Sequence, residues 1–168
     1  MGIKPTFTRA DIDRDLDAFR EKVESDLFKI LAYVGEEFVK EARQMTKADG
    51  GFGDVTGNLR SSIGYFILKD GKIVKENLKG SAGIGKSAAR IALNGVEKRD
   101  GYQLVGVAGM DYASKVESKG LNVISVQADT AIINLERILD KYADSLNKIG
   151  VSMERFSDDG ETVSTTFR

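Results

Sequence analysis

The sequence contains neither cysteine nor histidine. Without cysteine the chain has no disulfide, no thiol nucleophile and no thiolate ligand for a metal. Without histidine it lacks the commonest general base and the commonest transition-metal ligand. Catalysis would have to depend on carboxylates, lysine, tyrosine or a serine–lysine pair. We therefore expect a protein that is not an enzyme, and we assign it no catalytic residue, no metal ligand and no cofactor.

The sequence also lacks a long apolar run, and neither positive nor negative charge predominates. No stretch of about 18 apolar residues is present, so we expect no membrane span. Residues 1–5 lack the apolar core of a signal peptide, which favours synthesis in a cytoplasm. The 25 basic and 26 acidic residues nearly cancel, so the net charge indicates neither nucleic acid nor an anionic membrane as a partner. The length of 168 residues is typical of one domain.

A long amphipathic helix is the clearest pattern in the first third of the chain. Apolar residues recur there at steps of three and four, as one face of a helix requires. They are Ile12, Leu16, Phe19, Val23, Leu27, Ile30, Val34, Phe38, Ala42 and Met45. The spacing predicts a helix over residues 9–47, about 58 Å long, which begins with a capping box of Thr8 and Asp11. Gly35 indicates either a kink or a close approach to a neighbouring element. Such a helix either covers its own domain or extends beyond it onto another subunit.

A second helix is predicted over residues 127–149. Its apolar residues step by four and three, and they are Ala128, Ile132, Leu135, Leu139, Tyr142, Leu146 and Ile149. Gly150 stands where a glycine commonly ends a helix. This face packs either on the first helix of the same subunit or on another subunit. Residues 151–168 are polar and β-capable, and form either a solvated end or an arm that adds to a neighbour's sheet edge.

The middle of the chain is rich in glycine and turns, because 14 of the 18 glycines lie between Gly50 and Gly120. The strands that we expect lie at 61–69, 72–76 and 102–108, with a further short one at 122–125. Asp70-Gly71 predicts a hairpin turn, and residues 77–101 a long loop with one helical turn. The first strand is apolar on both faces, so we expect cover on both sides. The predicted fold class is α+β: residues 1–150 form one domain in which both helices cover one face of a small, mainly antiparallel sheet.

Residues 80–87 match the pattern of a phosphate-binding P-loop. The residues that would hold phosphate are Gly80, Gly85, Lys86 and Ser87. A P-loop follows a buried apolar strand, whereas residues 75–79 are polar. A nucleotide-binding loop is therefore the alternative to a flexible surface loop.

The same region is locally basic. Its candidate contact residues are Lys75, Lys79, Lys86 and Arg90. They form either a solvated surface or a contact for an acidic partner or a nucleic-acid backbone.

Two short segments carry a resemblance to a known family. The first contains Thr56, Gly57, Leu59, Arg60 and Ile63, and the second contains Tyr112, Glu117 and Gly120. With a long helix before them and another after them, these segments resemble the tail-completion and head–tail joining proteins of tailed bacteriophages. We interpret the first segment as a cap and turn, with Thr56 as the cap, that leads into a buried strand. The resemblance implies that the second segment ends a strand.

The resemblance also implies a function. It implies a non-catalytic virion protein that assembles into a homo-oligomeric ring, sixfold or twelvefold, at the head–tail interface or in the tail. The implied neighbours are neck, portal or tail proteins, and the resemblance also implies proximity to DNA and no membrane. Assembly would take place in the cytoplasm of the bacterial host.

Overall fold

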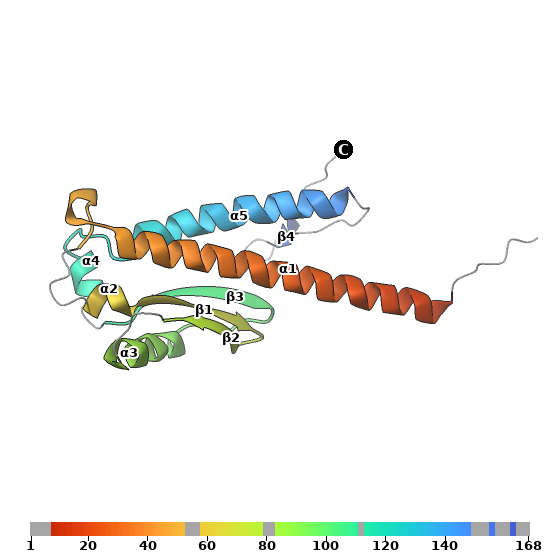
Figure 1. The fold of residues 1–168 in the computed structure, drawn as a ribbon, viewed down its shortest axis with the longest axis horizontal. Helices are drawn as coiled ribbons and strands as arrows, with labels where there is room; N and C mark the ends of the chain where they lie inside the picture. The colour runs from red at the N-terminus through yellow and green to blue at the C-terminus, as the bar shows by residue number, and fades with distance from the viewer. Residues whose placement is uncertain are drawn as a thin grey trace, which may run out of the picture.

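The computed structural model describes residues 8–52, 58–78, 83–110 and 113–148, and two short strands at 155–156 and 162–163. It is an α+β fold in which two long helices lie on one face of a small antiparallel sheet (Figure 1). The elements in chain order are α1 (Arg9–Gln44), the 3₁₀ helix η1 (Lys47–Asp49), α2 (Asn58–Ser62), β1 (Ile63–Lys69), β2 (Lys72–Asn77), α3 (Gly83–Asn94), β3 (Tyr102–Ala108), α4 (Ala113–Glu117), α5 (Ser125–Asn147), β4 (Arg155–Phe156) and β5 (Thr162–Val163).

The three-stranded sheet has the order β2-β1-β3, and both pairings are antiparallel. The turn between β1 and β2 is Asp70-Gly71, and both residues have positive φ, at +51° and +72°. Two successive positive φ values are the signature of the tight hairpin turn that Asp-Gly favours. The predicted hairpin is therefore confirmed, and so is the strand at 102–108.

The central strand β1 is buried on both sides, as its sequence predicts. Ile63, Tyr65 and Ile67 belong to the core beneath the long helices, whereas Phe66 and Leu68 face a second cluster. That second cluster includes Ala89 and Leu93 of α3. Helices therefore cover both faces of the sheet.

The prediction of a long loop over residues 77–101 is wrong, because 12 of these residues form α3. Its buried positions, Gly85, Ala89 and Leu93, are spaced four apart, as one helix face requires. Glycines at its start obscure the helical pattern in the sequence. The apolar second face of β1 needs cover from water, and α3 supplies it.

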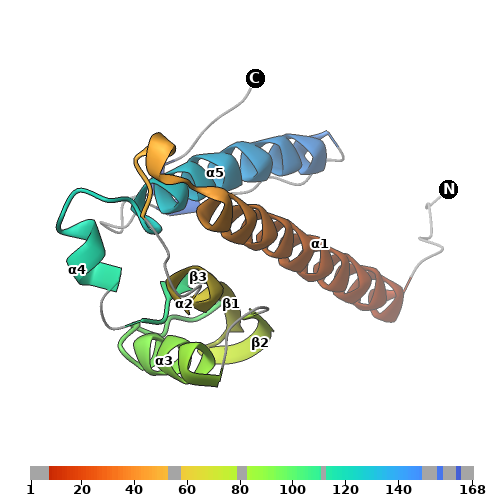
Figure 2. The same ribbon diagram turned by 60° about the vertical axis from the view of Figure 1, so that its left-hand side comes forward.

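The two long helices run antiparallel side by side (Figures 1 and 2). The Tyr142 hydroxyl of α5 donates a hydrogen bond to Asp26 of α1 at 3.3 Å. The predicted packing within one subunit is thus confirmed. The helix boundaries differ slightly from the prediction: α1 ends at Gln44, and α5 begins at Ser125. The short strand expected at 122–125 is reduced to one bridge, between Asn122 and Gly51.

The capping box at the start of α1 is present. The Thr8 backbone N–H donates to Asp11 at 2.9 Å, and the Asp11 backbone N–H donates to the Thr8 hydroxyl at 3.3 Å. Hydrogen bonds from Thr8 lower the pKa of Asp11. The cap satisfies amide groups that the first turn of a helix leaves unpaired.

Gly35 brings α1 close to β1. A Cβ built there would lie 2.7 Å from a ring carbon of Tyr65, so only glycine allows this approach. The Tyr65 hydroxyl donates to Glu36 at 2.9 Å, and the Asn77 amide donates to the same carboxylate at 2.6 Å. Burial, and then the bond to Glu36 and its negative charge, raise the pKa of Tyr65, so that its hydroxyl stays protonated. One carboxylate of α1 therefore joins two strands.

Replacement of Gly35 by alanine tests this contact. Helix propensity alone would make alanine more stable by about 1 kcal/mol. We expect the opposite, a loss of about 1–3 kcal/mol in the free energy of unfolding, because the methyl group overlaps the Tyr65 ring. Urea denaturation measures the difference.

Gly95→Ala is the matched control. A Cβ at Gly95 has only the Ala92 carbonyl oxygen near it, at 3.5 Å. We expect that variant to unfold within about 0.5 kcal/mol of the wild type. A Gly35→Ala protein more stable than the wild type would contradict the close packing.

Candidate functional site

Arg60, from the first motif, holds the C-terminal end of α1. Its guanidinium donates hydrogen bonds to the carbonyl oxygens of Arg43 and Met45, the second at 2.8 Å. The last carbonyls of a helix lack partners within the helix and carry the negative end of its dipole. The guanidinium carbon also lies 5.2 Å from the centre of the Phe52 ring. Arg60 is therefore a cationic cap for α1.

The apolar residues of the first motif lie in the core. Leu59 and Ile63 are buried, and the Ser62 hydroxyl donates to the Leu59 carbonyl at 2.7 Å. Their burial agrees with the interpretation of this segment as a turn into a buried strand. Thr56 and Gly57 lie outside the described residues, so the proposed cap at Thr56 stays a prediction.

Glu117, from the second motif, holds the N-terminal end of α5. One carboxylate oxygen accepts hydrogen bonds from the backbone N–H groups of Ile124 at 2.9 Å, Ser125 at 3.1 Å and Val123 at 3.3 Å. The Ser125 hydroxyl donates to the same oxygen at 2.8 Å. Burial raises the pKa of Glu117, but these bonds together outweigh it and hold the pKa below its ordinary value. Glu117 is thus an anionic cap on the positive end of α5.

The expectation that the second motif ends a strand is wrong. β3 ends at Ala108, and Ala113–Glu117 form the short helix α4. The Gly120 N–H donates to the Glu117 carbonyl at 2.8 Å, and Gly120 has φ of +77°, which favours glycine. This turn leads the chain back, so that the Glu117 side chain reaches the start of α5. Tyr112 lies outside the described residues.

The two capped helix ends lie at the same end of the molecule (Figure 2). Gly51, which follows α1, forms a parallel bridge with Asn122, which precedes α5. The Asn122 N–H donates to the Gly50 carbonyl at 3.0 Å, and its amide donates to the buried Gln127 at 2.9 Å. Gly50, Gly51 and Asn122 therefore join the neighbouring ends of α1 and α5, and Arg60 and Glu117 cap those two ends. Sequence reasoning identified the two motifs but not the capping roles of Arg60 and Glu117. These roles depend on contacts with residues beyond the neighbouring turn of the chain.

The P-loop match has a different structural context from that of a P-loop. Gly85, Lys86 and Ser87 lie within α3, and Gly80 lies outside the described residues. The strand before them, β2, is an edge strand of an antiparallel sheet. A P-loop instead follows a buried strand that aims the loop at the phosphates. The geometry therefore gives the nucleotide-binding alternative no support.

The basic residues of this region are partly neutralised within the chain. Arg90 pairs with Glu76 at 2.7 Å, and Lys75 lies 3.8 Å from Glu36. Lys86 is exposed and pairs with no carboxylate within the part of the chain that the structure describes, whereas Lys79 lies outside that part. The three candidate cations that the structure describes, Lys75, Lys86 and Arg90, therefore do not form one unpaired patch.

The described residues hold no group of three or more acidic residues that could bind a metal ion. Within the same ranges, no helix is both long and apolar enough to cross a membrane.

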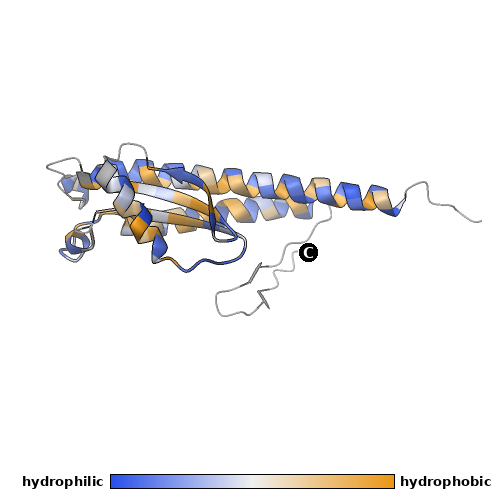
Figure 3. Cartoon of the chain, turned by 90° about the horizontal axis from the view of Figure 1, so that it is seen from below, coloured by the Kyte–Doolittle hydropathy of each residue, from blue (hydrophilic) through white to orange (hydrophobic). Residues whose placement is uncertain are grey.

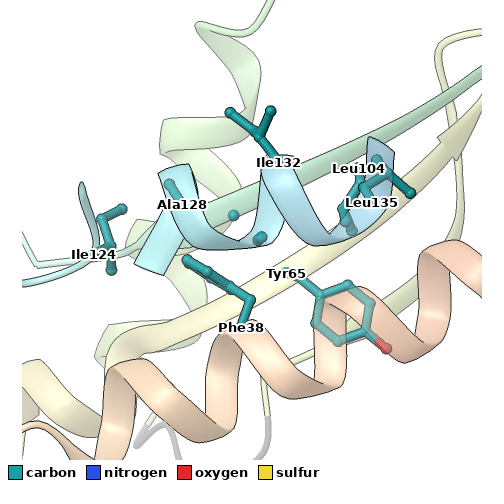
Figure 4. Close-up of a pocket in the computed structure, with 9 residues that line it drawn as sticks. Phe38, Tyr65, Leu104, Ile124, Ala128, Ile132 and Leu135 are labelled. Carbon is teal, nitrogen blue, oxygen red and sulfur yellow. The ribbon is translucent and has the colours of Figure 1, made fainter. Parts of the chain in front are cut away.

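The main concave feature is an apolar groove of about 180 Å³ between α5 and the sheet (Figure 4). Its floor consists of Phe38 of α1, Tyr65 of β1, and Leu104 and Gly106 of β3. Gly106 keeps this floor open, because a Cβ there would lie 2.7 Å from the Phe38 ring. The opposite wall consists of Ile124, which directly precedes α5, and of Ala128, Ala131, Ile132 and Leu135 of α5. The groove has the chemistry to bind an apolar side chain, and sequence reasoning missed it because its lining comes from four separate elements.

A second apolar surface lies on the N-terminal end of α1, the part of this helix that extends beyond α5 and the sheet (Figures 1 and 3). Ile12 and Leu16 belong to the same helical stripe as the buried Val34 and Phe38. They are nevertheless 44% and 50% exposed. The apolar stripe of α1 therefore continues beyond the sheet and α5, into a part of the helix where it is exposed (Figure 1).

Replacement of Glu117 by glutamine tests the cap on α5. We expect the variant to lose about 1 kcal/mol in the free energy of unfolding at pH 7, as for other N-terminal caps. Because the folded pKa lies below the ordinary 4.5, the charge of Glu117 stabilises the fold above that pH and ceases to do so as the pH falls through the folded value. The difference between wild type and variant should therefore shrink between pH 5 and pH 3.

Urea denaturation at several pH values measures this difference. Glu136→Gln, at an exposed position further along α5, is the matched control and should unfold within about 0.5 kcal/mol of the wild type at pH 7. If the two variants have the same stability at pH 7, the capping role of Glu117 is wrong.

Comparison with known proteins adds one finding to this geometry. Neither a curated protein nor a solved structure matches the chain. A family model does match residues 10–118, and its description is "Bacteriophage HK97-gp10, putative tail-component". The matched segment includes most of α1, the whole three-stranded sheet, the first motif, and Tyr112 and Glu117 of the second motif. The chain therefore belongs to the HK97-gp10-like family of bacteriophage tail components.

Proposed function

We propose that this phage structural protein is a neck or tail-completion subunit that assembles with copies of itself into a closed ring. The observation that carries the proposal is the exposed apolar stripe, Ile12 and Leu16, on the N-terminal end of α1 that extends beyond α5 and the sheet (Figure 1). Such a role needs a rigid body and surfaces that are buried only on assembly, and no catalysis.

The stripe gives α1 a reason to contact another subunit. Full burial of a leucine or isoleucine side chain contributes about 1.5–3 kcal/mol. Because Ile12 and Leu16 are about half exposed in the monomer, about half of this burial free energy can still be gained when a partner covers them. A contact between this helix and a different surface of the next copy is heterologous, and heterologous contacts close into rings when the rotation allows it.

Two other segments are proposed as contact elements. The outer face of residues 77–101 carries Ile91 on α3, which is 69% exposed. Residues 151–168 are proposed to form an arm that becomes ordered on a neighbour. The ring would lie at the head–tail interface or in the tail, beside neck, portal or tail proteins, after assembly in the host cytoplasm.

Removal of the apolar surface of α1 tests the proposal. In the variant Ile12→Ser with Leu16→Ser, we expect each subunit contact to weaken by about 2 kcal/mol, or roughly thirtyfold in the dissociation constant. Stability of the monomer should change little, because both side chains already contact water. Sedimentation equilibrium measures the assembly, and urea denaturation the monomer.

Tyr33→Ser is the matched control, since Tyr33 is an exposed apolar residue of the same helix but lies outside the stripe. It should leave the dissociation constant within about twofold of wild type, which is about 0.4 kcal/mol. Equal assembly of the double variant and the wild type would refute a contact through this stripe.

Truncation after Gly150 tests the arm. We expect the shortened chain to keep its helical circular dichroism, because α1, the sheet and α5 all precede the cut. It should fail to form the large assemblies of the full chain at the same concentration, by mass measurement in solution. Full assembly without residues 151–168 would remove the arm from the proposal and leave the contact through α1.

A further inference from the structure

The two edges of the sheet differ in how they are protected. The free edge of β2 carries Lys72 and Lys75, and its register shifts at Val74, which has no partner in β1. Charged side chains and bulges are the usual devices that keep an edge strand from pairing with another chain. The other edge strand, β3, spans residues 102–108 and contains no charged residue and no proline. Only one edge of this sheet is protected against strand addition.

The outer edge of β3 is also unpaired. The strand bonds to β1, and within the described residues no other backbone hydrogen bond involves residues 102–108. Each unpaired N–H and C=O along this edge can bond to an added strand about 4.8 Å away. The floor residues Leu104 and Gly106 of the groove belong to the same strand. An added strand would therefore present alternate side chains to the groove beneath α5.

The size of the groove limits what can enter it. Its volume is about 180 Å³, whereas an apolar cavity of about 150 Å³ is enough to hold one benzene molecule. A helix is about 10 Å across and does not fit. The groove therefore matches one aromatic ring, carried by an extended segment that pairs with β3.

We propose that this groove and the free edge of β3 bind the C-terminal arm of a neighbouring copy, with the ring of Phe167 in the groove. The inference rests on the proposed self-assembly. In an extended Thr162–Arg168 segment, alternate residues share a face, so Val163 and Phe167 lie on one face with Thr165 between them, and the other face carries only polar residues. The arm has one other aromatic residue, Phe156, which lies in β4.

A second copy is the proposed source of this strand. The two described strands of the arm pair with each other in a separate sheet, and not with β3 of their own chain. If β4 and β5 separate, the 20 residues after α5 and its final turn, 149–168, span up to about 66 Å when extended, enough to reach a neighbouring subunit. Exchange of such a strand around a ring would occupy every open edge.

Cysteine cross-linking tests this placement, because the natural chain has no cysteine. Two full-length single variants, Ala128→Cys in the groove and Thr165→Cys on the proposed inward face of the arm, are mixed and oxidised. Mass spectrometry of the linked peptides then measures disulfides between the two chains. We expect this mixed disulfide to predominate. It should decrease at least tenfold when the arm variant also carries Phe167→Ala, but not when it carries Phe156→Ala.

Thr166→Cys, on the opposite face of the arm, is the matched position control and should link at least tenfold less. Assemblies of normal mass without the mixed disulfide would overturn this inference and leave the ring proposal standing. A double variant that carries Ala128→Cys and Thr165→Cys in one chain gives a further test. A disulfide that forms in this variant only within one chain, and never between two chains, would also overturn the inference. A chain that stays monomeric at every concentration would overturn the inference together with the ring proposal.

Discussion

The close approach of α1 to β1 at Gly35 is the constraint on which the rest of the structure depends. Because Gly35 has no side chain, the Tyr65 ring lies against the helix and its hydroxyl reaches Glu36. Asn77 of β2 donates to the same carboxylate, so one turn of α1 is fixed to two neighbouring strands. This contact determines which part of α1 covers the sheet. It thereby also determines which part extends beyond it.

The two sequence motifs stabilise the opposite end of the same helix pair. Since α1 and α5 run antiparallel, the C-terminal end of α1 and the N-terminal end of α5 lie together. Arg60 places a cation on the negative end of one dipole, and Glu117 places an anion on the positive end of the other. Residues 57 positions apart in the sequence thus cap two neighbouring helix ends. A body that is held firmly at one end and extends a helix at the other suits a subunit of a phage tail.

The surface that remains for partners is more apolar than the amino-acid composition of the chain indicates, because some of its charged side chains are paired within the chain. Arg90 and Lys75 pair with carboxylates of the same chain, which leaves less charge for an acidic partner. By contrast, Ile12 and Leu16 on α1, the groove beneath α5 and the uncharged edge of β3 offer apolar or unpaired surface. Such surface costs free energy in water and is retained where a partner buries it. The exposed surface therefore favours burial of apolar side chains over pairing of charges.

The sequence by itself determined the elements whose pattern is local. The apolar stripes specified both long helices, Asp70-Gly71 specified the hairpin, and the two-faced pattern of β1 required cover on both sides. Three other features depend on tertiary contacts: the helix at 83–94, the two helix caps and the groove beneath α5. The helix at 83–94 is stabilised by burial of its apolar face against Phe66 and Leu68 of β1. Arg60 and Glu117 cap α1 and α5 only because the folded chain brings their side chains to the ends of these helices. The groove beneath α5 likewise exists only after four elements meet, since no single segment contains its lining.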